Sequence, residues 1–149
     1  MIEQPSEQLR FPYVRFPVSD PFTKRQSVVY RPVIPVILHS RKMALTCQAL
    51  IDSGADECIF SGEVAFALGF PLLQGKPRVF AGIGGSVIGY LHPTTLHLGR
   101  VRFACPIYYS DEWNHLRFGL LGQVGFLSHF GISLDYRAKQ ITFTPQLSR

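Results

Sequence analysis

The residues best suited to chemistry are an acid and a glycine turn that follow directly on an apolar segment. The segment is 49–56, with the sequence ALIDSGAD. An acid at the end of a buried strand, where the chain turns sharply, points its carboxylate into a cleft. In such a turn Ser53 can hydrogen-bond to the backbone, and Gly54 allows a second backbone to approach closely. Asp-Ser-Gly is also common in β-turns without a function, so this segment by itself leaves both interpretations open.

A second segment, 80–87 with the sequence FAGIGGSV, places three glycines around one isoleucine. This composition is typical of a mobile hairpin tip with one apolar point, which is suited to closing over a ligand. A flexible turn without a role has the same composition. A dinucleotide-binding loop is not indicated, because the G-x-G-x-x-G pattern fails at Val87 and no crossover helix follows.

A third segment, 120–122 with the sequence LLG, precedes a short predicted helix. In this order and spacing, the three segments resemble the retropepsin-like aspartic proteases, the single-lobed family of retroviral proteases and their bacterial relatives. Members of that family carry two apolar residues before Asp-Thr/Ser-Gly-Ala, then a glycine-rich flap, then two apolar residues and a glycine ahead of a short helix. The resemblance extends over roughly residues 28–144.

The resemblance implies a fold, an activity and a set of site residues. The fold is an all-β, closed β-barrel-like acid-protease lobe with one or two short helices, and the activity is that of an aspartic endopeptidase, a hydrolase. The residues implied in catalysis are Asp52, Ser53 and Gly54. Those implied in substrate binding are Ala55, Asp56, Gly82, Ile83, Gly84 and Gly85, the last four as the tip of the flap. Those implied in supporting the active-site loop are Leu120, Leu121 and Gly122.

Two positions depart from the family pattern. Ala81 stands where a glycine often opens the flap tip. Gln123 stands where retroviral members usually have an arginine, which pairs with the acid that matches Asp56. The resemblance therefore does not carry over an ion pair at Asp56.

Aspartic peptide hydrolysis needs two carboxylates that share one proton and a water molecule. The chain has one Asp-Ser/Thr-Gly motif, because Asp20, Asp111 and Asp135 lack the flanking pattern. One chain thus carries half of an active site, and a two-fold homodimer would bring Asp52 against its symmetry mate. The expected partners are a second copy of the chain and a polypeptide substrate, and no metal or organic cofactor is required.

Two other functions remain open at this stage. A catalytically inactive retropepsin-like module would bind extended peptides, or dimerise, without cutting, and the serine variant of the motif and the missing arginine favour it. A β-barrel nucleic-acid binder is suggested by the net charge of +5 and an aromatic content of 13%. The basic residues form no cluster and do not alternate with aromatic residues on one strand, so we expect no nucleic-acid partner.

Composition and length set further bounds on the class of protein. A chain of 149 residues, 46% of them hydrophobic, favours one folded unit with a sizeable core. No apolar run approaches the roughly 20 residues that span a bilayer, and the N-terminus lacks the pattern of a secretory signal. We therefore expect no membrane partner and a cytoplasmic location. Cys47, Cys58 and Cys105 form no C-x-x-C pair and are expected to be reduced thiols, and the histidines lack zinc-like spacing, so no metal site is expected.

The elements that must hold the site in place are mostly strands. Residues 1–30 contain four prolines and alternating aromatics, which favours an extended arm or a pro-segment, and residues 31–149 form the protease domain. Residues 33–38 and 43–51 are predicted to pair as a hairpin. Further predicted strands are 76–81, 87–90, 94–98, 101–108, 132–136 and 140–143. A short helix is predicted from the N-cap Ser61 to Gly69, and a second one at about 123–129.

Overall fold

The computed structural model describes residues 7–115 and 117–146, and most of its regular structure is β-strand. The helices in these residues are short. They are the α-helix α1 (Gly62–Ala67) and the 3-10 turns η1 (Leu72–Gln74), η2 (Asp111–Trp113) and η3 (Leu127–His129). The prediction of an all-β fold with few helices is confirmed.

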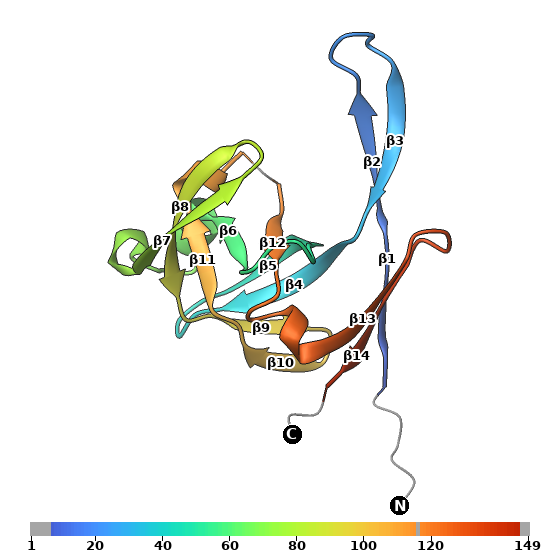
Figure 1. Ribbon diagram of the computed structural model, residues 1–149. Coiled ribbons are helices and arrows are strands. Elements are labelled where there is room, and N and C mark those ends of the chain that lie inside the picture. The colour runs from blue at the N-terminus through green and yellow to red at the C-terminus, as the bar shows by residue number, and fades with distance from the viewer. Residues whose placement is uncertain (1–6, 116, 147–149) are drawn as a thin grey trace, which may run out of the picture.

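The strands of the described residues form three sheets (Figure 1). The largest has the order β10-β9-β4-β5-β12-β6-β11-β8-β7. Its members are β4 (Val33–His39), β5 (Ala44–Ile51), β6 (Ile59–Ser61), β7 (Lys76–Gly82), β8 (Gly85–His92), β9 (Thr95–Leu98), β10 (Val101–Ala104), β11 (Ile107–Ser110) and β12 (Gly119–Leu121). A three-stranded sheet contains β1 (Leu9–Pro12), β14 (Gln140–Pro145) and β13 (Phe130–Asp135), and a two-stranded ribbon contains β2 (Val14–Ser19) and β3 (Gln26–Arg31).

One hydrophobic core joins the two larger sheets. Strand β4 shows how the sequence builds it, because Ile34, Val36 and Leu38 are buried while Pro35 and Ile37 between them are exposed. This alternation is the two-residue period of a strand with one face on the core. From the other sheet, β14 contributes fully buried side chains to the same core. The large sheet and the terminal sheet therefore fold as one unit.

The hairpin β4–β5 carries the chain to the candidate catalytic acid. Its register pairs Val33 with Leu50 at one end and His39 with Ala44 at the other, as the sequence predicts. The turn is closed by Ser40, whose Oγ accepts hydrogen bonds from the backbone N–H groups of Lys42 and Met43. The last residue of the hairpin is Ile51, so Asp52 is the first residue beyond the strand.

The helix predicted after Ser61 is present with the predicted ends. The N–H of Val64 donates to Ser61 Oγ at 3.4 Å, which caps the first turn of α1. Gly69 follows the helix with φ of +76°, a left-handed conformation that glycine adopts at helix ends without strain.

Two predictions of secondary structure are wrong. Residues 123–129 do not form a helix: they form turns that end in the short η3, and Gly125 in the middle has φ of +96°, which no right-handed helix accommodates. The predicted strand 101–108 is interrupted, because Pro106 has no N–H to donate and Cys105 donates its own to Thr94 O instead of to a neighbouring strand. It is present as the two strands β10 and β11.

The first part of the chain is extended but not separate from the rest. Strand β1 pairs with β14 at the edge of the terminal sheet. Strands β2 and β3 pair with each other, and the expected boundary between residues 30 and 31 falls inside β3. Residues 1–6 lie outside the described residues. No helix among residues 7–115 and 117–146 is long and apolar enough to cross a membrane.

Candidate active site

Two backbone hydrogen bonds, one from Ile51 and one from Asp52, hold the end of β5 in place. The N–H of Ile51 donates to Pro32 O at 2.9 Å, and the N–H of Asp52 donates to Leu121 O at 3.1 Å. These bonds attach the end of β5 to the start of β4 and to β12. The Asp52 side chain is half-buried, so its carboxylate keeps access to solvent.

A tight turn after Asp52 fixes the orientation of its carboxylate. The N–H of Gly54 donates to Asp52 Oδ1 at 3.0 Å, and the N–H of Ala55 donates to Asp52 O at 3.2 Å. A Cβ atom on Gly54 would lie 3.3 Å from Asp52 Oδ1, so glycine lets the carboxylate lie close to the backbone of the turn. A side-chain oxygen that accepts from the backbone two residues on is typical of an Asx turn. Here the hydrogen bond from Gly54 fixes the orientation of the Asp52 carboxylate.

Strand β12 passes behind the loop and supports it. It lies between β5 and β6, parallel to the first, with Leu121 opposite Ile51, and antiparallel to the second, with Leu120 opposite Ile59. Leu121 is fully buried. A Cβ atom on Gly122 would lie 2.2 Å from Glu57 O, which no structure tolerates without a backbone shift. Only glycine therefore fits at the point where β12 crosses the loop.

The two residues after this glycine fasten the loop through three hydrogen bonds. The N–H of Gln123 donates to Ala55 O at 2.9 Å, and its side-chain Nε2 donates to Ser53 O at 3.1 Å. The N–H of Val124 donates to Asp56 O at 2.8 Å. Gln123, which stands where an arginine would be expected, thus contacts the backbone of the loop and not an acid. The Asp56 side chain is exposed, and no ion pair involves it among the described residues.

An ion pair that the sequence does not indicate lies next to this loop. Arg78 Nη1 in β7 lies 2.5 Å from Glu57 Oε1, and the guanidinium also lies 5.5 Å from the centroid of the Phe80 ring. The two residues are 21 positions apart in the sequence, on a loop and on a strand that no local pattern connects. This contact places the β7–β8 hairpin beside the loop that carries Asp52.

The tip of the β7–β8 hairpin projects into open space within the part of the chain that the structure describes. Gly82 pairs with Gly85, which leaves Ile83 and Gly84 as a two-residue turn with Ile83 fully exposed. Gly85 has φ of +123°, a conformation that favours glycine. A Cβ atom on Gly82 or Gly84 would meet nothing within 4 Å. Among the described residues, the structure gives no hydrogen bond between this tip and the Asp52 loop, so it brings residues 52–56 and 120–122 together but leaves residues 82–85 free.

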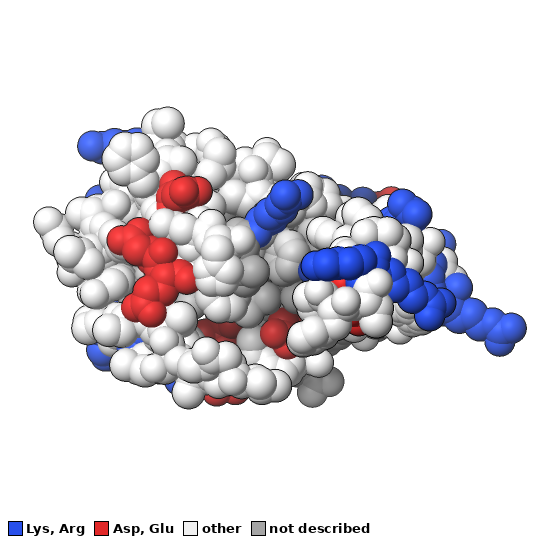
Figure 2. All heavy atoms as spheres, turned by 90° about the horizontal axis from the view of Figure 1, so that it is seen from above, with Lys and Arg blue, Asp and Glu red and all other residues white. Residues whose placement is uncertain are grey.

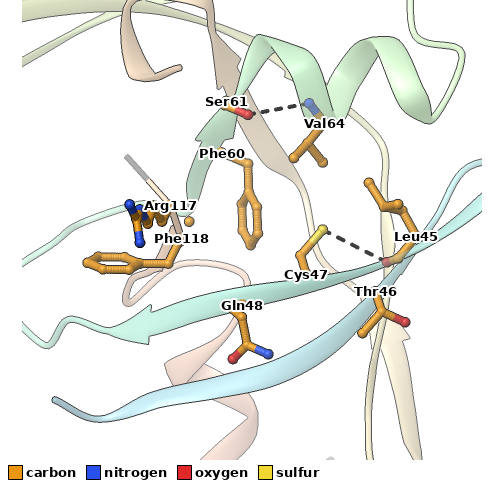
Figure 3. A pocket seen from close by; sticks show the side chains of 10 residues that line it. Leu45, Thr46, Cys47, Gln48, Phe60, Ser61, Val64, Arg117 and Phe118 are labelled. Carbon is orange, nitrogen blue, oxygen red and sulfur yellow. Dashed lines mark hydrogen bonds between the residues drawn. The ribbon is translucent and has the colours of Figure 1, made fainter. Parts of the chain in front are cut away.

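Two other features lie outside this site. A cavity of about 320 Å³ opens between β5, β6 and α1, where Leu45, Cys47, Phe60 and Val64 point toward one another (Figure 3). None of the candidate site residues lines it. Over residues 7–115 and 117–146, no three His, Cys, Asp or Glu side chains are grouped so as to hold a metal ion.

The three cysteines are free thiols, as the sequence predicts. Burial raises the pKa of Cys47 to about 11. Cys105 Sγ donates to Cys58 Sγ at 3.9 Å, and this hydrogen bond lowers the pKa of Cys58 and raises that of Cys105. Both side chains are fully buried, and the Cys58 thiol donates to Val124 O. Cys58 therefore packs behind the Asp52 loop as part of the core.

No protein-family model matches the sequence, and no curated protein does either. The structure, by contrast, is similar to solved proteases. A retropepsin-like aspartic protease from Rickettsia conorii aligns over 87% of this chain and 98% of its own, with 16% sequence identity and a TM-score of 0.56. EIAV protease, solved as a complex with the inhibitor HBY-793, aligns over 70% of this chain and 88% of its own, with 19% identity and a TM-score of 0.47.

The strand order and the likeness to the Rickettsia structure define the class of fold. This chain has the single-lobe acid-protease fold of the retropepsin-like aspartic proteases. The resemblance drawn from three short segments of sequence is thus confirmed at the level of the fold.

Proposed function

We propose that this protein is an aspartic endopeptidase that cuts polypeptides with a pair of Asp52 carboxylates, one from each copy of a homodimer. In this proposal residues 31–149 form the protease domain and residues 1–30 an arm attached to it. The observation that carries the proposal is the Asp52 carboxylate, which is oriented by the Gly54 N–H on a loop that Gly122 and Gln123 hold rigidly from behind.

The chemistry needs two carboxylates in different protonation states. One is ionised and accepts a proton from a water molecule as the water oxygen attacks the peptide carbonyl carbon. The other is protonated and donates to the carbonyl oxygen, which gives a neutral tetrahedral intermediate. Two like charges a few ångströms apart are costly, so such a pair keeps one shared proton and titrates as a unit. Aspartic proteases hold two carboxylates that share one proton in this way.

The other acids that lack the motif are engaged in local turns, which supports a second copy as the source of the second carboxylate. Asp20 Oδ1 accepts from the N–H groups of Phe22 and Thr23, and Asp135 Oδ1 accepts from the N–H of Ala138. Asp111 lies in the exposed turn η2. Asp111 does follow a buried strand, β11, but none of the three is followed by Ser/Thr-Gly as Asp52 is.

The remaining site residues receive roles that fit their surroundings. The hydroxyl of Ser53 is exposed and has no partner among the described residues of its own chain, so it is free to bond to the loop of the second copy. The backbone of residues 54–56 lines the floor on which an extended substrate lies. Residues 82–85 form the flap, with Ile83 as its apolar contact to the substrate or to the second flap.

The test is hydrolysis of a denatured protein from about pH 3 to about pH 8, with Asp52→Asn as the control. We expect cleavage by the wild type and a loss of several orders of magnitude in the variant, with an unchanged thermal melt. Turnover by Asp52→Asn within about tenfold of the wild type would refute the assignment of Asp52. Binding of an extended peptide without cleavage at any pH would favour a non-catalytic peptide-binding module instead.

A further inference from the structure

The two-stranded ribbon of residues 14–31, called the ribbon below, stands apart from the rest of the fold (Figure 1). Its strands contact mainly each other. Its base is attached to the fold: the Phe16 ring packs edge-on against Phe118 at 6.1 Å, and Lys139 Nζ lies 4.8 Å from the centroid of the Tyr30 ring. An isolated two-stranded hairpin is only marginally stable in water. The outer half of the ribbon therefore needs a surface to lie on.

One face of the ribbon is mostly apolar. The pairing of β2 with β3 puts Val14, Phe16, Val18 and Val29 on the same face, together with Ser27 and Arg31, because directly opposed residues point the same way. Phe16 on this face contacts Phe118, which immediately precedes β12. At the far end of the ribbon, the Phe22 side chain is 92% exposed. The face thus extends outward from the strand that supports Asp52.

The charges of the ribbon and of the opposite end of the molecule are complementary. Arg15, Lys24 and Arg25 are exposed on the ribbon, and Asp20 is its one acid. The opposite end, where α1 and η2 are in contact, carries three exposed acids. This acidic end consists of Glu63, Asp111 and Glu112. Figure 2 shows a group of Lys and Arg side chains at one end of the molecule and a group of Asp and Glu side chains toward the other, with single charges of both signs elsewhere.

We propose that the ribbon is a clasp that holds the second copy of the chain. Its mostly apolar face lies against the partner copy, and the basic residues at its turn, Lys24 and Arg25, lie against the partner's acidic end. Two-fold symmetry repeats the contact, so each copy holds the other and both charge patches are used twice. The proposal rests on the proposed function, since the half-site at Asp52 is what requires the second copy.

The ribbon is also connected directly to the loop that the second copy would complete. Strand β3 continues through Pro32 into β4, and Pro32 O accepts a hydrogen bond from the N–H of Ile51, the residue before Asp52. The ribbon that would hold the partner is thereby linked to the backbone of the loop that carries Asp52. The clasp and the half-site belong to one continuous surface.

The test is sedimentation equilibrium of the full chain beside the double variant Lys24→Glu/Arg25→Glu. Neither side chain makes a hydrogen bond or an ion pair within the described residues, so the change alters surface charge without breaking a contact in the monomer. We expect a dimeric wild type whose dissociation constant rises with salt, and a variant whose dissociation constant is higher by at least about tenfold. The control, Arg41→Glu/Lys42→Glu in the β4–β5 turn, has the same change in charge and is expected to dimerise as the wild type does.

A second pair of substitutions tests the location of the contact. Glu63→Lys/Glu112→Lys, added to the ribbon variant, reverses the acidic end and is expected to restore dimerisation. A ribbon variant that dimerises as tightly as the wild type overturns the clasp, and so does a wild type that is monomeric at every concentration. A ribbon variant that has a raised KM for a peptide but the same molecular mass in solution as the wild type overturns it as well, because the ribbon then contacts the substrate. A dimer that depends on the ribbon but cuts no peptide supports the clasp and contradicts the proposed function.

Discussion

Arg78 Nη1 lies 2.5 Å from Glu57 Oε1, and this ion pair joins the proposed flap to the loop that carries Asp52. The Glu57 side chain is largely buried, whereas that of Arg78 is half-exposed. The guanidinium is also positioned by the rings of Phe80 and Tyr108. The contact therefore sets the position of β7 relative to the acid, and it does so where the loop leaves the candidate site.

We expect Arg78→Gln to raise KM for a peptide by about threefold to tenfold, because the flap loses its attachment to the loop and closes less often. The thermal melt is expected to change little, since the Arg78 side chain is half-exposed and solvent partly screens the pair. The measurement is steady-state hydrolysis, with Lys76→Gln as the control on the same face of β7. An unchanged KM in Arg78→Gln would mean that the ion pair does not position the flap.

Gly122→Ala is expected to be strongly destabilising. Its Cβ would lie 2.2 Å from Glu57 O and 2.6 Å from Ala55 O, and both contacts are with backbone that cannot rotate away. We expect a loss of about 3 kcal/mol or more in the free energy of unfolding. Gly84→Ala is the matched control, because a Cβ there meets nothing within 4 Å. Equal melting temperatures for the two variants would contradict the close crossing of β12 behind the loop.

Substitutions at the proposed flap tip are expected to change the kinetics and not the stability. Ile83 is fully exposed and contributes nothing to the core of the single chain. Ile83→Ala is expected to weaken closure over a peptide by about 1–3 kcal/mol, the range for losing a buried aliphatic contact, without lowering the melting temperature. Gly84→Val is expected to lower kcat or raise KM in the same way. If peptide hydrolysis is unchanged in both variants, the glycine-rich hairpin is only a turn.

The stacked histidines of β4 and β9 give a prediction about pH. The centroids of the His39 and His97 rings lie 4.3 Å apart, and the Nε2 atoms of both are shielded from solvent with no hydrogen-bond partner among the described residues. Burial, His39 and the nearby Arg102 lower the pKa of His97 below its ordinary value of 6.5. The unfolded chain then binds more protons than the folded one as the pH falls through 6.5. The stability contributed by the neutral ring is thus complete above that pH and is lost below it.

We therefore expect the melting temperature to fall between about pH 7.5 and about pH 5.5, and to fall less steeply in His97→Gln. The comparison of the two slopes isolates His97 from the carboxylates, which titrate in both proteins. Parallel slopes would show that the proton balance of His97 does not contribute to stability.

Features that depend on neighbouring residues could be predicted from the sequence. The hairpin 33–51 follows from two apolar runs around a polar turn, and α1 follows from the cap Ser61 and the stop Gly69. The break at Pro106 and the turns around Gly125 were missed, although both residues are of the types that interrupt regular structure. In each case a run of apolar residues was given more weight than the single residue that ends it.

Features that depend on distant residues could not be predicted in this way. The insertion of β12 between β5 and β6 pairs Gly119 with Ala49 and Leu120 with Ile59, which are far apart in the sequence. Only the resemblance to a family indicated that Gly122 lies behind the loop. The Glu57–Arg78 ion pair and the bond from Gln123 to Ser53 O have no signal in the spacing of charges. A single sequence shows which residues can do chemistry but not which strands will meet.

The central claim is that the two carboxylates come from two copies of the chain, and subunit mixing tests it most directly. Wild-type protein and Asp52→Asn are combined in equal amounts at constant total concentration, allowed to exchange subunits, and assayed for peptide hydrolysis. If a site needs Asp52 from both copies, only wild-type homodimers cut, and the activity falls to about one quarter of that of the undiluted wild type. An activity of about one half would contradict the account, because each chain would then carry a complete site of its own.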